Sequence, residues 1–206
     1  MARNSSRSRW LQRQHRDPYV KQARKARFRS RAVYKLMEID EKDRLFQKGQ
    51  TIVDLGAAPG SWSQYASAKV GPQGRVISVD ILTMQDLDNV LFIKGDFREK
   101  RVFDACLAQI GEAGADLVIS DMAPNISGIR VTDQARTMAL VEQARDFALR
   151  ALKPGGSLLL KLFEGEGATE FRCDLEEHFS EVNTRIPKAS RVNSRECYVL
   201  ARSYKV

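Results

Sequence analysis

Residues 51–60 read TIVDLGAAPG and decide the fold. The first five, Thr51–Leu55, form a short apolar run typical of a buried strand, and the rest form a turn that contains glycine and proline. A helix is predicted directly afterwards, from Ser61 to about Val70, and the sequence GPQG at 71–74 ends it. A strand, a tight turn and a helix in this order begin a parallel β-α-β unit.

The same alternation of strands and helices occurs along the rest of the chain. Helices are predicted at 30–45 with Ser30 as N-cap, at 98–110, at 133–152 with KPGG at 153–156 closing it, and at 168–179. Further strands are predicted at 75–80, 90–94, 116–120, 157–163, 182–186 and 196–201. Strands that are apolar throughout favour a mostly parallel sheet, while the short connection 187–195 makes the last two strands an antiparallel hairpin. The predicted fold is α/β, with a mostly parallel seven-stranded sheet.

The composition is that of an ordinary globular protein. Of the 206 residues, 43% are hydrophobic and 29% are charged, which excludes disordered and fibrous classes. No apolar run approaches the roughly 18 residues that a membrane helix needs, and no apolar segment follows the basic N-terminus as in a secretory signal. The three cysteines form no CxxC pair, and with only two histidines they favour reduced thiols and no metal site. We therefore expect a cytoplasmic protein that contacts no membrane.

Positive charge is concentrated at the N-terminus. Residues 1–35 contain twelve Lys and Arg and one acidic residue, Asp17, whereas the rest of the chain has a balance of −3. Such a patch attracts a polyanion, most often nucleic acid, although a solvated tail or a contact with anionic lipid is also compatible with it. We divide the chain into a basic, partly mobile extension at 1–29 that contacts nucleic acid, and an α/β domain at 30–206.

Ionisable residues stand at the ends of several predicted strands. Asp80, Asp96 and Asp121 lie at or just beyond three strand ends, the loop 56–60 follows another strand, and Lys161 lies within an apolar one. Ligands of open α/β sheets bind beyond the carboxyl ends of the strands, so these positions predict the functional site.

The loop 56–60 favours an adenosine ligand without a pyrophosphate. It is neither G-x-G-x-x-G nor a P-loop, and Pro59 removes a backbone N–H donor that a pyrophosphate would use. This disfavours a nicotinamide-dependent oxidoreductase and leaves S-adenosylmethionine, which has no phosphate. Asp80 is then placed to accept both ribose hydroxyls, and Asp96 to contact the adenine amino group. Taken singly, each position also fits a simple turn or a helix cap.

Four stretches together resemble one enzyme family. They are DLGAAPGSWSQ at 54–64, SDMAPNISG at 120–128, LKLFEGEG at 160–167 and SRVNSRECYV at 190–199, and the similarity covers nearly the whole chain. They resemble the FtsJ-type ribosomal RNA large-subunit 2′-O-ribose methyltransferases. The resemblance implies a Rossmann-like class I methyltransferase fold, S-adenosylmethionine as methyl donor, and a uridine of 23S rRNA in the large ribosomal subunit as acceptor. We expect a monomer that needs no protein partner.

The resemblance also implies roles for single residues. Cofactor contacts fall on Gly60, Trp62, Asp80, Asp96 and Asp121, and a catalytic constellation falls on Lys35, Asp121, Lys161 and Glu196. Two positions depart from the family pattern. Ser61 replaces a usual glycine and remains able to cap the following helix, and Glu164 replaces a frequent glutamine.

The chemistry of ribose methylation makes Lys161 the candidate general base. The 2′-hydroxyl must be aligned with the methyl group and lose a proton, and a lysine accepts a proton only when burial or a nearby cation favours its neutral form. Lys35 is the candidate cation, and Asp121 and Glu196 are candidates for orienting groups. Each residue also has a non-catalytic interpretation. Lys161 could only form a structural ion pair with Asp121 or extend its amine to solvent, and Lys35 could be a solvated surface lysine. Glu196 could protect the edge of the sheet against pairing with another strand.

The candidate RNA contacts are less specific. Arg29, Arg31, Arg191 and Arg195 are candidate phosphate contacts, and Tyr34 or Trp10 is a candidate for stacking on a base. A non-catalytic ribosome-assembly factor with the same fold would share the basic segment, but the presence of Lys161 and Asp121 favours an enzyme.

Overall fold

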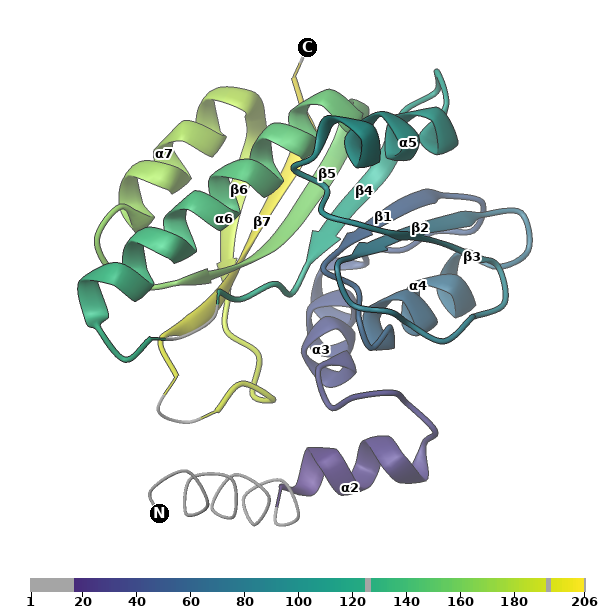
Figure 1. Cartoon of the computed structure of the whole chain (residues 1–206), viewed down its shortest axis with the longest axis horizontal. Coiled ribbons are helices and arrows are strands. Elements are labelled where there is room, and N and C mark those ends of the chain that lie inside the picture. The colour runs from purple at the N-terminus through teal and green to yellow at the C-terminus, as the bar shows by residue number, and fades with distance from the viewer. Residues whose placement is uncertain (1–16, 125–126, 192–193, 206) are drawn as a thin grey trace.

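The computed structural model describes residues 17–124, 127–191 and 194–205, and its strands form one seven-stranded sheet (Figure 1). The strands are β1 (Thr51–Leu55), β2 (Arg75–Asp80), β3 (Val90–Lys94), β4 (Ala115–Ser120), β5 (Leu152–Phe163), β6 (Phe179–Arg185) and β7 (Glu196–Tyr204). Their order is β3-β2-β1-β4-β5-β7-β6. β1 to β5 pair in parallel, and β7 is antiparallel to both β5 and β6. The predicted mostly parallel sheet with antiparallel C-terminal strands is confirmed.

Helices cover both faces of this sheet. They are α2 (Pro18–Lys25), α3 (Val33–Asp43), α4 (Ser61–Val70), α5 (Lys100–Ile110), α6 (Arg130–Ala151) and α7 (Ala168–His178). α3 and α4 pack on one face, while α5, α6 and α7 cover the other (Figure 1). In the part of the chain that is described, none of these helices combines the length and the hydrophobicity that crossing a bilayer requires.

The alternation of side chains along the strands produces two separate cores. In β5, Leu158, Leu160 and Leu162 belong to the core under α5, α6 and α7. Leu159 belongs to the core under α3 and α4, and Lys161 lies two residues further along the same face because side chains alternate in a strand. The polar residues described below occupy the end of this second core.

Several predicted element ends differ from the structure: α6 begins at Arg130 rather than at 133, β6 begins at Phe179 rather than at 182, and β7 extends to Tyr204 rather than to 201. α3 begins at Val33 instead of Ser30, and the Ser30 hydroxyl lies 2.7 Å from that of Ser61, so that Ser30 joins two segments rather than capping α3. α6 ends at Ala151, and residues 153–156 lie inside β5 rather than in a loop after the helix. The pairing of β4 with β5 shifts register here, which accommodates the proline and glycines within a strand.

A helix was not predicted within the basic extension. α2 begins after Asp17, whose carboxylate accepts a hydrogen bond from the Tyr19 amide at 3.0 Å, with Pro18 in its first turn. Ala23 of α2 is buried, and the Arg31 guanidinium pairs with Asp17. Residues 3–9, the part of the extension that is predicted to be mobile, and Trp10, a candidate for stacking on a base, lie outside the described residues.

A buried carboxylate connects the end of α3 to α4. Asp40 is only 5% exposed. Its Oδ1 accepts a hydrogen bond from the Leu45 amide at 2.8 Å, and its Oδ2 accepts one from the Tyr65 hydroxyl at 2.8 Å and lies 2.9 Å from Lys69 Nζ. α3 also carries Lys35, one of the predicted catalytic residues, so this network helps to set the position of that lysine.

We predict that Asp40→Ala destabilises the protein. The substitution leaves a buried hydroxyl and a buried amide without an acceptor, and we expect the free energy of unfolding to fall by about 2–4 kcal/mol. Urea denaturation measures this change. Asp104→Ala is the control, because Asp104 forms an exposed ion pair with Lys100 and its loss should leave stability nearly unchanged. Equal effects of both substitutions would contradict a structural role for the Asp40 network.

Candidate active site

Two lysines, from α3 and β5, and two acidic residues, one directly after β4 and one at the start of β7, lie next to one another. Lys161 Nζ lies 2.8 Å from Asp121 Oδ1 and donates a hydrogen bond to the Asp121 carbonyl at 2.7 Å. Lys35 Nζ lies 2.7 Å from Glu196 Oε1 and 3.8 Å from Asp121 Oδ1. Lys161 Nζ and Glu196 Oε2 are 3.9 Å apart. These four side chains, called the tetrad below, are largely buried, and their formal charges cancel.

The sheet register explains why the tetrad assembles. Lys161 is paired directly with Tyr198 between the antiparallel strands β5 and β7, so both side chains lie on the α3–α4 face. Glu196 stands two residues before Tyr198 and shares its face. Lys35 reaches the same place from α3, where its neighbours Val33 and Leu36 are buried in the core.

Tyr198 also contacts the tetrad, although it was not predicted as a site residue. Its hydroxyl donates a 2.5 Å hydrogen bond to Asp121 Oδ1, and its ring packs against Trp62 with centroids 5.7 Å apart. Burial, reinforced by the charges of Asp121 and Glu196, raises the pKa of Tyr198 well above its usual value. Tyr198 therefore remains a hydrogen-bond donor at neutral pH. Its spacing of two residues from Glu196 in a strand was the signal that could have identified it.

A cavity of about 720 Å³ lies at the carboxyl ends of β1, β2, β3 and β4. It is open at the point where the strand order reverses between β1 and β4, which is where ligands bind in folds of this type. Its volume falls in the range of small-molecule sites. Asp80, Asp96 and Asp121 all line it, so the structure brings together three of the predicted cofactor contacts.

Asp80 and Asp96 are held in different ways. Asp80 accepts hydrogen bonds from the backbone amides of Ala58 at 2.9 Å and Leu82 at 2.7 Å, which fixes its carboxylate against the loop 56–60. Asp96 accepts hydrogen bonds from Arg98 Nε at 2.7 and 2.8 Å, and these bonds lower the pKa of Asp96. Both carboxylates are fixed by protein groups at the cavity wall.

A smaller cavity of about 100 Å³ adjoins the first. The two share Gly56, Ala58 and Asp121, and Trp62 lines only the smaller one. Gly56 has φ +72°, and a Cβ there would lie 2.0 Å from Met122 Cγ, so the close packing of Met122 requires a glycine. Asp121 thus faces both cavities and also belongs to the tetrad.

Gly60 and Ser61 lie at the start of α4. Gly60 is the N-cap, lines neither cavity, and has φ +98°. Ser61 is already inside the helix, and its hydroxyl contacts Ser30, so the prediction that Ser61 caps α4 is wrong. The reason is positional: a cap must stand one residue before the helix, and Gly60 occupies that place.

The four candidate RNA-contacting arginines have different surroundings. The Arg31 guanidinium pairs with Asp17 and donates to the Ala189 carbonyl. Arg195 Nη1 donates to the Glu164 carbonyl at 3.2 Å. Arg191 is exposed. Arg29 contacts three backbone carbonyls and is considered separately below.

The structure gives Glu164 a local function. Its carboxylate pairs with Arg172 and accepts a hydrogen bond from Cys197 Sγ at 3.3 Å, on the face opposite the tetrad. Burial raises the pKa of Cys197 to about 12, so this thiol stays protonated. All three cysteines are free thiols; Cys106 and Cys197 are buried, whereas Cys173 is exposed.

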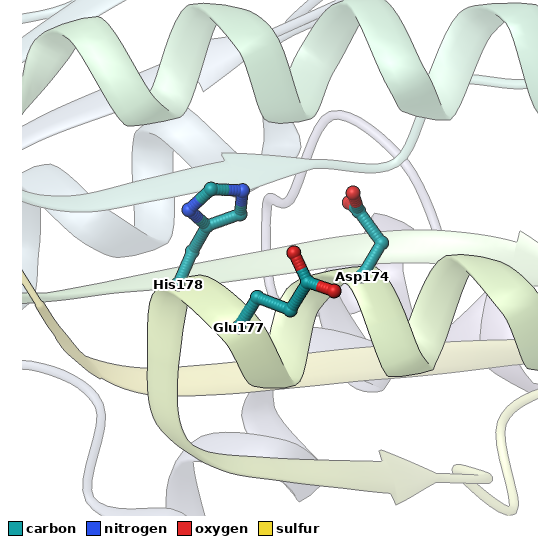
Figure 2. A group of neighbouring side chains, drawn as sticks. All are labelled: Asp174, Glu177 and His178. Atoms are coloured by element: carbon teal, nitrogen blue, oxygen red, sulfur yellow. The ribbon is translucent and has the colours of Figure 1, made fainter.

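One group of side chains has the composition of a metal site. Asp174, Glu177 and His178 rise from the same side of α7, with potential ligand atoms within 4.8 Å of one another (Figure 2). The Asp174 carboxylate already pairs with Arg145, which a cation would have to displace. None of the three residues lines the cavities at the strand ends. We assign no metal to this group.

The family model of the FtsJ-like methyltransferases matches residues 28–204. The chain belongs to the FtsJ-like methyltransferase family. A relative from Pseudomonas paraeruginosa, named ribosomal RNA large subunit methyltransferase E, is 52% identical over 205 residues, covering 100% of this chain and 99% of its own. A relative of the same name from Alkalilimnicola ehrlichii is 54% identical over 196 residues, covering 95% and 94%. The predicted family is confirmed.

A solved structure supports the family fold. A ribosomal RNA methyltransferase from Plasmodium falciparum superposes with a TM-score of 0.76 at 27% identity, covering 86% of this chain and 98% of that one. The predicted Rossmann-like methyltransferase fold is therefore confirmed.

A buried carboxyl group lies beneath the candidate active site of this FtsJ-like chain. Asp54 is 1% exposed and accepts a 2.6 Å hydrogen bond from Ser63, whose hydroxyl in turn accepts one from Ser78 at 2.8 Å. Burial, with the negative charges of Asp121 and Asp80 adding to it, raises the pKa of Asp54 to about 7. The folded state therefore binds the Asp54 proton more tightly than the unfolded state does.

This pKa predicts a pH dependence of stability. The bound proton stabilises the folded state, and this stabilisation is complete below about pH 4, where Asp54 is protonated even in the unfolded chain. It is lost as the pH rises toward 7. Asp54→Asn removes the proton and should flatten the curve of unfolding free energy against pH, by on the order of 1.4 kcal/mol per pH unit within this window. Urea titrations at several pH values measure it, with Asp104→Asn as exposed control. Parallel curves for Asp54→Asn and the unmodified protein would contradict the raised pKa.

Proposed function

We propose that the chain transfers a methyl group from S-adenosylmethionine to the ribose 2′-hydroxyl of a uridine in the 23S rRNA of the large ribosomal subunit. The observation that carries the proposal is the position of Asp121, which faces the cavity and also holds Lys161 at 2.8 Å. A donor in the cavity would thus lie beside a lysine suited to accept a proton. The names of the relatives support large-subunit rRNA as the substrate.

The cavity has the chemical character that the donor needs. Asp80 and Asp96 offer carboxylate oxygens at the ends of β2 and β3, suited to ribose hydroxyls and to an adenine amino group. Three carboxylates, those of Asp80, Asp96 and Asp121, line the cavity beside two guanidinium groups, those of Arg98 and Arg136. This slight excess of acidic groups suits a ligand with a cationic centre. Trp62 and Gly60 complete the cofactor contacts that the family resemblance implies. When bound, the donor supplies an electrophilic methyl carbon attached to a sulfonium sulfur.

The tetrad supplies the proton transfer. In the proposed reaction, Lys161 Nζ accepts the proton of the 2′-hydroxyl while the oxygen forms a bond to the methyl carbon and the carbon–sulfur bond breaks. Asp121 orients Lys161 through its carboxylate and its carbonyl. Lys35, held by Glu196 at 2.7 Å, places a second cation 3.8 Å from Asp121 Oδ1, so that the two lysines share the Asp121 carboxylate. No step in this scheme needs a metal.

The basic segment supplies affinity for RNA. We propose residues 1–29 as an RNA-contacting extension and 30–206 as the methyltransferase domain of a cytoplasmic monomer. Arg191 and Arg195 lie on the connection between β6 and β7, close in sequence to Glu196, and serve as phosphate contacts near the acceptor ribose. A purely structural assembly factor would not need a buried lysine beside a donor cavity.

The proposed activity is tested with a radiolabelled methyl donor. Large subunits from a strain that lacks this enzyme are incubated with the protein, beside naked 23S rRNA, and the alkali-resistant linkage is mapped. We expect label on one uridine ribose in the large subunits. Label on a base, or none, would contradict the proposal.

We predict that Lys161→Ala lowers the methyl-transfer rate by about 10²–10⁴-fold, as expected for the loss of a general base. Retention of RNA should be unchanged, because the side chain is only 8% exposed. Lys100→Ala is the matched control, since that lysine is exposed and lies on α5. Single-turnover transfer and filter binding measure the two effects. Transfer at the unmodified rate would refute the assignment of Lys161.

We predict a smaller effect for Tyr198→Phe. The phenylalanine keeps the packing against Trp62 but removes the hydrogen bond to Asp121 Oδ1. The Asp121 carboxylate, which orients Lys161, is then held less firmly. We expect kcat to fall by roughly tenfold, the equivalent of about one hydrogen bond, with the KM for the donor unchanged. A change in KM alone would place Tyr198 in donor binding instead.

A further inference from the structure

The Arg29 guanidinium donates hydrogen bonds to backbone carbonyls at the surface of the molecule. Nη1 donates to the Pro59 carbonyl at 3.1 Å and to the Gln85 carbonyl at 2.7 Å, and Nη2 donates to the Asp86 carbonyl at 2.7 Å. The three acceptors belong to two different loops. One side chain from the basic segment therefore connects segments that are 30 and 57 residues away in sequence.

Both loops form part of the wall of the 720 Å³ cavity. The loop 56–60 contributes Gly56 and Ala58, and the segment that follows β2 contributes Ile81 and Leu82. The Ala58 amide also donates to Asp80, so the first loop is tied to the carboxylate that ends β2. Arg29 adds a second connection on the outer side of the same two loops.

The backbone around Arg29 is fixed as well. Its amide donates to Gln64 Oε1 at 3.3 Å, and Gln64 Nε2 donates to the Arg27 carbonyl at 3.0 Å, so this segment lies across the start of α4. A Cβ at Gly60 would lie 2.8 Å from Arg29 Nη1 and 2.4 Å from Met84 Sδ. The glycine thus leaves the space that the guanidinium occupies.

We propose that Arg29 is a positioning residue for the methyl-donor cavity. This inference rests on the proposed function only in naming the donor. A guanidinium presents its N–H groups in a rigid planar fork and can span two loops, whereas the ammonium of a lysine is a point charge without that geometry. The Arg29 guanidinium donates three hydrogen bonds to carbonyls and so stabilises the cavity wall instead of binding RNA phosphates. Exposed arginines such as Arg191 make the phosphate contacts.

The test compares Arg29→Lys and Arg29→Ala with Arg191→Ala as control. Calorimetric titration of the RNA-free protein with S-adenosylmethionine gives the donor Kd, and binding of 23S rRNA at several salt concentrations gives the number of phosphate contacts. We expect both Arg29 variants to bind the donor about tenfold more weakly, a loss of about 1.4 kcal/mol of binding free energy. The salt slope, meaning the slope of log K for RNA binding against the logarithm of the salt concentration, should stay unchanged. Arg191→Ala should keep the donor Kd and reduce the salt slope by about one.

Hydrogen exchange gives a readout that does not depend on the donor. Arg29→Lys and Arg29→Ala should increase amide exchange in residues 81–89, while exchange in β5 stays as in the unmodified protein and so reports an intact fold. Failure of the unmodified chain to bind S-adenosylmethionine would sink the proposed function, and the exchange result alone would then decide the role of Arg29. Unchanged exchange, or full donor affinity in Arg29→Lys, would overturn the positioning role. A reduced RNA salt slope with unchanged donor Kd would make Arg29 a phosphate contact.

Discussion

The structure of the site depends on the burial of a charged amine in an apolar strand. Lys161 follows three consecutive leucines and is 8% exposed, and an unpaired ammonium in such a place would cost several kcal/mol. The antiparallel pairing of β5 with β7 places Glu196 and Tyr198 on the face of this lysine. Asp121, directly after β4, offsets the cost of burying the Lys161 ammonium with two oxygen atoms, its carboxylate Oδ1 and its backbone carbonyl.

This compensation also connects structure to chemistry. Asp121 cannot be replaced as the partner of Lys161 without altering the wall of the donor cavity, because the same residue serves both. Lys35 is held at the other side by Glu196, so the two cations share the two carboxylates. With both lysines charged, the tetrad carries no net formal charge. The proposed role of Lys161 as proton acceptor therefore requires that it first give up its own proton.

Much of this was predictable from local patterns, and the rest was not for identifiable reasons. Thr51–Leu55 and Ser61–Val70 have the predicted bounds because each combines a clear apolar period with a glycine-rich end. Residues 153–156 were expected to form a loop, since proline and glycine usually interrupt strands, but they lie within β5 at a register shift, between the pairing of Leu152 with Ala115 and that of Ser157 with Leu117. Tyr198 and Arg29 depend on register and on contacts between distant segments, which no local pattern contains.

The central claim is that the donor cavity and Lys161 meet at Asp121. A crystal structure with bound S-adenosylmethionine tests it most directly. The account predicts adenosine against Asp80 and Asp96, with the methyl carbon directed toward the space next to Lys161 Nζ, so that one oxygen atom fits between them. A donor bound elsewhere, or a methyl group directed away from Lys161, would contradict the account.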